Sequence, residues 1–519
     1  MNKEREEIER KKLLLFQRII TLIESLYVQS LHLPLAEMHR KKIQLVIFLV
    51  FSIAIGAFLF HSVENNPQPD TQMVRYGEEL FDAINNGQLG EYLMTVRKYP
   101  LLNSVLFIPI HQSLLTVDRI IHFLAPSLPL VSSWLYANLA GRMLVLLFAI
   151  GTLILIQRLS QLVSLGGSAP LLMLSSYLFF LFSTAARPHI PVMFWTLLSF
   201  YYSIHLSKKH NRKNIFMSFA SATAAACTLQ NGFLAFLFPL WGYFQSGKKR
   251  DNFFRGILLM IICLSIAFLF GYTFLLRITA GDSTGITYDL GHNYSQIWDG
   301  SGFLQLLRVL VGNEILLTLF AIAGIARVFR GIDAVFIGIV PIAGYLVIYC
   351  LLFGIYAGTS PRFFLMLVPF LALLGARAFE NAPRAAQFAF LTIVFIMCAK
   401  FASLGMLQDS FQLVSSRLNL VRGLVYSEIP PYMFSIDARR LIFSTNDNAL
   451  FRVQYYNEET PPEWVECESI YASPRLATGM YANFLWNEMD WGFFRLLNIY
   501  RLGPNLSLLC KRSLLEQIR

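Results

Sequence analysis

The sequence predicts an α-helical polytopic membrane protein with about eleven transmembrane helices and a C-terminal soluble α/β domain. Three observations indicate this class. Of the 519 residues, 55% are hydrophobic and only 14% are charged, and the mean hydropathy is +0.52, a composition too apolar for a soluble enzyme. Apolar runs of bilayer-spanning length recur along the chain, and short basic segments separate them.

Residues 1–42 are expected to form a cytoplasmic amphipathic segment. They are rich in Lys and Arg, which by the positive-inside rule places the N-terminus in the cytoplasm. Within them, residues 13–31 carry apolar side chains at helical spacing, a pattern that favours a helix lying in the membrane interface over one that crosses it. Residues 43–60 form the first uncharged apolar run. Because no cleavage site of small residues follows, we expect this run to be retained as an anchor.

The transmembrane domain is expected to cover residues 43–407 and to include a long outer loop at residues 61–130 with two or three short helices. Loops of this length usually have a function. Residues 277–308 are polar and predict a second outer loop. The basic turns at residues 208–213 and 248–250 fall on one side of the membrane in this arrangement. The remaining apolar runs predict spans, one of them a hairpin broken near Asn231, at residues 139–156, 169–184, 190–206, 216–244, 257–275, 314–328, 334–353, 363–378 and 388–407.

The odd number of spans places residues 408–519 outside the cytoplasm, where they are expected to form a small α/β domain. The sequence pattern predicts a strand at residues 440–445, a turn at 446–448, a helix at 449–456 and another strand at 506–510. The domain organisation is thus a basic N-terminal segment, a transmembrane domain and an extracytoplasmic domain.

Neither cysteine spacing nor acidic clusters predict a metal site. All six cysteines are isolated in the sequence. Cys467 and Cys510 lie in the last domain, and whether they form a disulfide stays open because spacing does not establish proximity. Asp282, Asp289 and His292 match no strong metal-binding pattern. We therefore predict no metal site, and dependence on a divalent metal stays open.

The net charge of +11 does not indicate a nucleic-acid partner. In a soluble protein such a charge would favour a nucleic-acid partner. Here the basic residues gather in short segments between apolar runs, which is typical of the inner surface of a membrane protein. The expected partners are therefore membrane lipids and a substrate at the membrane, and no nucleic acid.

An acidic group opens the outer loop, directly after the first span. Pro67 and Pro69 hold the chain extended before Asp70, and a helical pattern that contains Glu78 and Glu79 follows. Asp70 therefore lies at or just before a helix start. Its carboxylate either caps free N–H groups there, which is the more common role, or takes part in catalysis.

Basic residues lie at the same expected surface. Arg187 opens a span within Arg-Pro-His, and either snorkels to the interface or belongs to a site. Arg362 follows Pro361 at a helix start, where a guanidinium binds phosphate through two parallel hydrogen bonds or pairs with a lipid headgroup. His189 is better explained as structural than as catalytic. An acidic group opposed by these cations suggests a ligand that carries phosphate.

These residues resemble the GT-C superfamily of polyprenyl-phosphate-sugar glycosyltransferases, which includes protein O-mannosyltransferases and lipid A aminoarabinose transferases. The resemblance rests on the first-loop acid Asp70, the Arg187-Pro188 pair, and the late segment Ser-Pro-Arg-Phe-Phe-Leu-Met-Leu-Val-Pro-Phe-Leu-Ala-Leu-Leu. It covers about residues 43–405, and many members also carry a soluble outer domain. This chain departs from the pattern because many members have two adjacent acids in the first loop, whereas Thr71 follows Asp70 here.

The resemblance implies a GT-C-like transmembrane domain that transfers a sugar, with inversion, at the outer side of a bacterial inner membrane, for a cell-envelope glycan. The donor is then a sugar linked to a polyprenyl phosphate, undecaprenyl or dolichyl phosphate. Asp70 is the general base, and Arg187 and Arg362 bind the donor phosphate. Glu78, Glu79 and His189 take supporting roles. The sugar is left open, as is the acceptor, which is a glycan, a lipid or a protein.

Three other functions stay open. A transporter or flippase of a lipid-linked or anionic solute is the main alternative, although such proteins usually show repeated halves and polar groups at mid-membrane depth. A polysaccharide polymerase or ligase would place its large loop later in the chain. A non-catalytic scaffold is disfavoured, because ionisable clusters near a membrane usually mark a function.

Overall fold

The computed structural model describes a mostly helical chain with a three-stranded sheet near its C-terminus. The described residues are 72–94, 100–124, 133–163, 167–183, 186–246, 250–271, 300–328, 336–355, 361–406, 451–455, 462–470 and 506–511. All of them belong to the second of two compact units, Ala54–Arg519. The basic N-terminal segment, the first span and Asp70 lie outside the described residues, so the predictions for them stay predictions.

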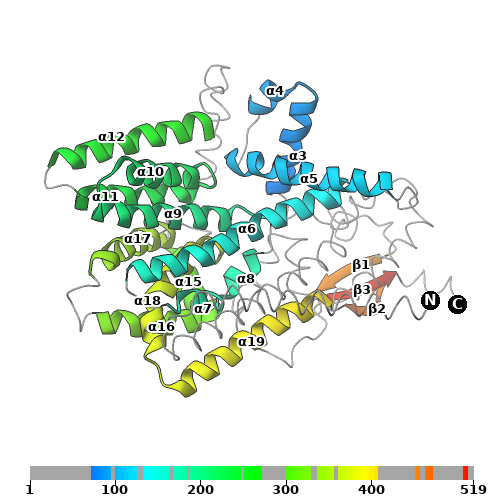
Figure 1. The fold of residues 1–519 in the computed structure, drawn as a ribbon. Helices are drawn as coiled ribbons and strands as arrows, with labels where there is room; N and C mark the ends of the chain where they lie inside the picture. The colour runs from blue at the N-terminus through cyan, green and yellow to red at the C-terminus, as the bar shows by residue number, and fades with distance from the viewer. Residues whose placement is uncertain are drawn as a thin grey trace, which may run out of the picture. The chain divides into compact units, whose positions relative to one another are not determined.

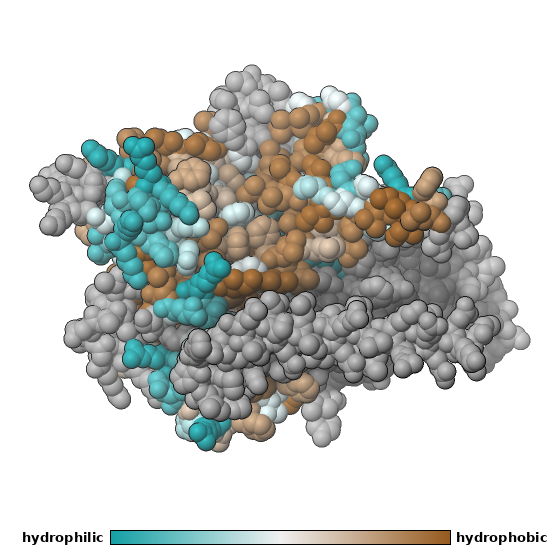
Figure 2. Space-filling model, viewed as in Figure 1, coloured by the Kyte–Doolittle hydropathy of each residue, from teal (hydrophilic) through white to brown (hydrophobic). Residues whose placement is uncertain are grey.

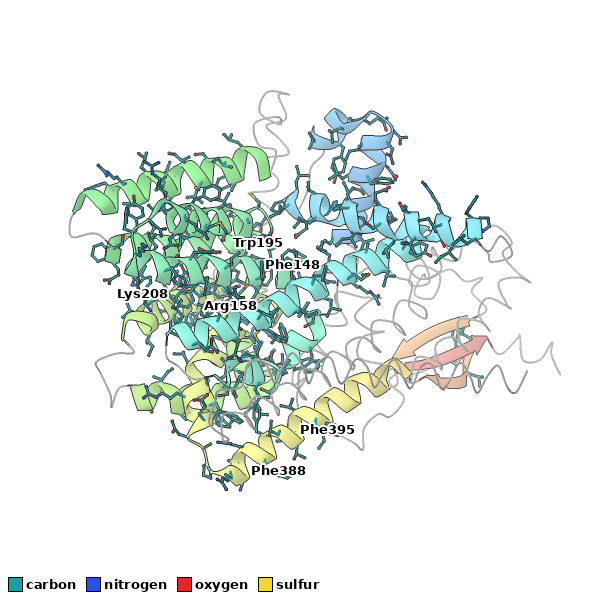
Figure 3. All side chains as sticks on the ribbon, in the orientation of Figure 1. Phe148, Arg158, Trp195, Lys208, Phe388 and Phe395 are labelled. Atoms are coloured by element: carbon teal, nitrogen blue, oxygen red, sulfur yellow. The ribbon has the colours of Figure 1, made fainter. Side chains whose placement is uncertain are left out.

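Two long helices, α6 (Ser133–Leu162) and α9 (His189–Lys208), run side by side in the same direction. At one end, a Cβ atom added at Gly141 would lie only 2.9 Å from the Cβ atom of Ala186. At the other end, the Lys208 Nζ atom donates to the carbonyl oxygen of Leu162 at 3.5 Å. Between these points, the rings of Phe148 and Trp195 lie 5.7 Å apart, and Figure 3 shows Arg158 and Lys208 together at the far end.

The basic turn at residues 208–213 lies at that far end, where the His210 ring contacts Ser246 at the end of α11 (Leu237–Ser246). Helices α10 (Arg212–Ala226) and α11 pack against α9, and α12 (Arg250–Ile266) packs against α10 and α11 (Figure 1). Figure 2 shows apolar residues, in brown, over much of one face, with hydrophilic residues, in teal, gathered where Figure 1 places the ends of α10 and α12. The basic side chains exposed there include Lys208, Lys209, Arg212 and Lys213. We call this end the basic end and the opposite end the outer end.

The hairpin that the sequence predicts is confirmed, including its break. The 3-10 helix η1 (Gln230–Phe236) separates α10 from α11. Gly232 allows the close approach, because a Cβ atom added there would lie 2.1 Å from the carbonyl oxygen of Ala225. The Ser199 hydroxyl in α9 donates to the carbonyl oxygen of Ser218 at 3.0 Å, which ties the hairpin to α9.

Two segments differ from their predictions, one because its helix is broken and the other because a predicted loop is helical. Residues 169–184 form two short helices, α7 (Ala169–Met173) and α8 (Tyr177–Ser183), instead of one. Residues 301–308, expected to be loop, form helix α15 (Ser301–Arg308), which continues through the π-helix η3 (Val309–Asn313). This segment meets α16 (Ile315–Val328) at a bend of 100°.

The late spans are confirmed as helices. They are α17 (Phe336–Ile355), the 3-10 helix η4 (Pro361–Leu367) with α18 (Val368–Glu380), and α19 (Arg384–Met406). Helices α16 and α18 pack closely, since a Cβ atom added at Gly324 would lie 1.9 Å from the carbonyl oxygen of Leu374.

The outer loop forms α3 (Gln72–Asn85), α4 (Leu89–Met94) and α5 (Leu102–Leu124). The prediction of short helices was wrong for α5, which has 23 residues. Leu80, Ala83 and Tyr92 form the small core that joins α3 to α4.

The start of α5 docks on the outer end. The Leu101 amide donates to the carbonyl oxygen of Gly271 at 3.0 Å, where the π-helix η2 (Ala267–Gly271) ends. The Asn103 Nδ2 atom donates to the carbonyl oxygen of Thr228 at 3.1 Å. The predicted outer loop therefore lies at the end opposite the basic turns.

Within the described residues, three helices are long and apolar enough to cross a membrane, at 102–124, 139–162 and 362–380, and the bent pair would make a fourth. Apolar helices of 10–17 residues add to these. The membrane character of the chain is therefore supported, and the number of about eleven spans stays a prediction.

The C-terminal part contains a three-stranded antiparallel sheet. Its strands are β1 (Phe451–Tyr455), β2 (Trp464–Ile470) and β3 (Leu506–Lys511), in the order β1-β3-β2. The strand predicted at 506–510 is confirmed. The helix predicted at 449–456 was wrong, because residues 451–455 pair with β3. The strand predicted at 440–445 lies outside the described residues, and Cys467 and Cys510 lie on neighbouring strands.

Candidate active site

Helix α3 of the outer loop and the turn that carries Arg187 both pack against the same point of α6. The contact passes through Gly141 of α6, since a Cβ atom added at Gly141 would lie 2.7 Å from Val74 Cγ2 of α3 and 2.9 Å from Ala186 Cβ. Gly77, one turn after Val74, packs closely against Phe107 of α5, since a Cβ atom added at Gly77 would lie 2.3 Å from the Phe107 ring. The segment that follows Asp70 is therefore held beside the start of α9.

Arg187 and His189 lie at the start of α9. Pro188 precedes the first helical residue, where its missing N–H costs no hydrogen bond. The Arg187 side chain is half-buried, whereas His189 is only 2% exposed. His189 packs against the ring of Phe182 at 5.4 Å between centroids.

Arg362 approaches the same point from a distant part of the chain. It lies in η4, and its guanidinium carbon is 5.3 Å from the centroid of the Phe363 ring. That ring contacts the imidazole of His189, with centroids 6.2 Å apart. Such a cation–π contact orients a guanidinium without neutralising its charge. The structure therefore brings together Arg187, His189 and Arg362, three of the residues that the sequence indicates.

The charge balance of this cluster is positive. His189 precedes the apolar part of α9, and burial, followed by the positive charges of Arg362 and Arg187, holds the pKa of its imidazole well below the usual value. A lowered pKa favours the neutral form of the imidazole. Both ring nitrogens are buried and form no hydrogen bond with any residue that the structure describes. Buried polar atoms of this kind call for a partner, such as a bound ligand.

The acidic residues of α3 lie in a different environment. Burial, followed by the charge of the exposed Asp82, raises the pKa of Glu78 to about 7. Glu78 and Glu79 are both half-buried. Glu78 lies one helical turn after Val74 and so on the side of α3 that faces α6. The predicted supporting roles of these two acids remain predictions.

Arg142 is a residue that the sequence interpretation passed over. It follows Gly141 in α6 and is only 3% exposed, which places a buried cation beside the contact between α3 and the Arg187 turn. A charged residue within a span is rare and usually functional, and this signal was present in the sequence. Among the residues that the structure describes, no cluster of His, Cys, Asp and Glu could hold a metal ion.

Replacing Gly141 by Ala is expected to lower the free energy of unfolding, and so the thermal stability in detergent. Overpacking costs about 1–3 kcal/mol. About 1 kcal/mol of this is regained because Ala has a higher helix propensity than Gly. The new methyl group meets the fixed Cβ atom of Ala186. Gly344→Ala is the matched control, since nothing lies within 4 Å of a Cβ atom at that helical position. Equal melting temperatures for the two variants would contradict the tight contact.

No family model matches the chain, and the comparison with curated proteins finds no match. Two solved structures are similar, both of ArnT from Cupriavidus metallidurans. The structure bound to undecaprenyl phosphate is 11% identical, covers 72% of each chain and gives a TM-score of 0.48. The apo structure is 13% identical, with 77% of this chain and 69% of that chain covered and a TM-score of 0.46. Similarity at these values does not identify an activity for the chain.

Proposed function

We propose that the chain is an integral membrane glycosyltransferase that transfers a sugar from a polyprenyl-phosphate-linked donor to an acceptor on the extracytoplasmic side. The observation that carries this proposal is the cluster of Arg187, His189 and Arg362 at the outer end. Two guanidinium groups lie near the buried imidazole of His189, whose nitrogens form no hydrogen bond with any described residue. Such a cluster suits a phosphate, because guanidinium groups bind phosphate oxygens through paired hydrogen bonds.

In the proposed reaction, an acceptor hydroxyl oxygen attacks the anomeric carbon as the bond from that carbon to the phosphate oxygen breaks. The configuration at the carbon inverts. The hydroxyl proton moves to Asp70, acting as general base. The polyprenyl phosphate leaves with the bonding electrons, and Arg187 and Arg362 stabilise the negative charge that develops on it.

The proposal also includes the orientation of the chain in the membrane. The N-terminus lies in the cytoplasm and the C-terminal domain outside it, in a bacterial inner membrane, and the donor lipid lies among the helices. Arg187 and Arg362 are on the outer end, opposite the exposed Lys208, which suits a reaction on the side away from the basic turns. The acceptor is a glycan, a lipid or a protein.

Replacing Arg362 by Ala is expected to lower turnover by about 10²- to 10³-fold, since one donor to the developing charge is lost. The measurement is transfer of label from radiolabelled polyprenyl-phosphate sugars by membranes that contain each variant in equal amount. Arg187→Ala is expected to act in the same direction. Arg384→Ala removes an exposed arginine at the start of α19 and serves as the control. Wild-type turnover in Arg362→Ala would remove the phosphate site from the proposal.

A transporter or flippase is the second candidate, and the broken helices favour it. Discontinuous helices with buried polar groups are typical of transporters, and the chain has such breaks between α7 and α8 and at Glu314, which is 2% exposed. Movement of a lipid-linked sugar across liposomes that contain the protein, with no transfer to any acceptor, would support this candidate over the enzyme.

A further inference from the structure

A buried hydrogen-bond chain reaches the backbone of η4 from two other parts of the fold. The Tyr349 hydroxyl, on α17, donates to the carbonyl oxygen of Phe363 at 2.5 Å. The Asn231 Nδ2 atom, in η1, donates to the Tyr349 hydroxyl oxygen at 2.9 Å. Tyr349 is 0% exposed and Asn231 is 6% exposed. The hydrogen bond between Asn231 and Tyr349 is therefore shielded from water, and the one to Phe363 is partly buried. Loss of a buried partner is costly.

The same tyrosine also supports the ring on which Arg362 rests. Its ring stacks on Phe353 at 4.5 Å between centroids, and Phe353 stacks on Phe363 at 5.5 Å. Phe363 in turn contacts both the guanidinium of Arg362 and the ring of His189. Tyr349 thus restrains Phe363 in two ways. Its hydroxyl binds the Phe363 carbonyl oxygen, and its ring supports the Phe363 ring through Phe353.

We propose that Tyr349, held by Asn231, is a positioning residue that places Arg362 for binding the donor phosphate. This inference rests on the proposed function of the Arg362 site. Tyr349 does not touch the substrate in this proposal. It acts by restricting the backbone and ring of Phe363, so that the guanidinium is already oriented when phosphate arrives and less freedom is lost on binding.

The fold supplies a matched control one helical turn away. Tyr345 lies on the same side of α17, is 1% exposed, and its ring is 5.6 Å from that of Tyr349. Its hydroxyl forms no hydrogen bond with any residue that the structure describes. Tyr345→Phe therefore removes a buried hydroxyl without breaking the chain to η4, whereas Tyr349→Phe removes the same group and breaks it.

The test is binding of a radiolabelled polyprenyl phosphate without sugar to the purified full-length protein in detergent. Tyr349→Phe is expected to weaken binding by about 3- to 10-fold, since it removes the hydrogen bond to the Phe363 carbonyl oxygen as well as the one from Asn231. Tyr345→Phe is expected to leave binding unchanged. The decisive measurement is a double-mutant cycle with Arg362→Ala. If Tyr349 acts through Arg362, its substitution has no further effect once the guanidinium is absent.

Each outcome decides between the two proposals. If Tyr349→Phe weakens polyprenyl phosphate binding equally in the wild-type and Arg362→Ala proteins, or does not weaken it at all, the positioning role is overturned. The proposed function then still stands. Wild-type binding in Arg362→Ala overturns the phosphate site itself, and the positioning role with it. If Tyr349→Phe does not yield folded protein, Asn231→Leu takes its place in the cycle, with a smaller effect in the same direction expected.

Discussion

Replacing Asp70 by Asn is expected to lower sugar transfer by about 10²- to 10⁴-fold, because the acceptor hydroxyl loses its general base. Asn is chosen because it caps helices as well as Asp does. Helix α3 begins just after this position, at Gln72, so the capping role that competes with catalysis is preserved in the variant. A loss of activity then reports the missing carboxylate and not a disturbed helix start.

The measurement is the rate of label transfer together with the binding of a polyprenyl phosphate, which is expected to stay unchanged. Asp82→Asn is the matched control, since Asp82 is an exposed acid on the same helix. Full turnover in a well-folded Asp70→Asn protein would remove the general base from the mechanism and leave capping as the role of Asp70.

Replacing Glu314 by Ala is expected to cause the largest loss of stability. Glu314 is 2% exposed and lies at the 100° bend before α16. Its Oε1 atom accepts hydrogen bonds from the Ser176 hydroxyl at 2.8 Å and from the Leu178 amide at 3.0 Å. Removal of the side chain leaves both donors buried without a partner, at a cost of about 1–3 kcal/mol each.

Thermal unfolding in detergent measures this effect, with Glu314→Gln as the conservative variant. Gln keeps an acceptor oxygen at nearly the same place, so most of the stability is expected to return. If Glu314→Ala and Glu314→Gln unfold at the same temperature as the wild type, the capping of α8 by Glu314 contributes nothing to stability.

Much of the helical layout could be predicted from the sequence. Hydrophobic runs and basic turns act locally, since the length of an apolar run and the charges beside it are enough to place a helix and its ends. The broken hairpin near Asn231 and the helix of residues 388–407 were predicted on these grounds, and the structure has η1 and α19 there. The helix start after Asp70 followed from two prolines and the helical pattern behind them.

The errors arose where a distant segment decided the local structure. Residues 451–455 are a strand because β3, far along the chain, supplies their hydrogen bonds, and pairing of this kind overrides local propensity. The run at 169–184 is broken near Ser176, whose hydroxyl bonds to a carboxylate 138 residues away. No pattern within either segment carries that information.

The sequence by itself determined that the chain belongs in a membrane, where its basic end lies and which charged residues stand at the opposite end. Only the tertiary structure decided that Arg187, His189 and Arg362 meet, because that depends on how η4 packs against the start of α9. It also placed Tyr349 and Asn231 behind Arg362. Hydropathy measures how each segment interacts with its solvent, whereas a site depends on contacts between segments, which side-chain packing and buried hydrogen bonds select.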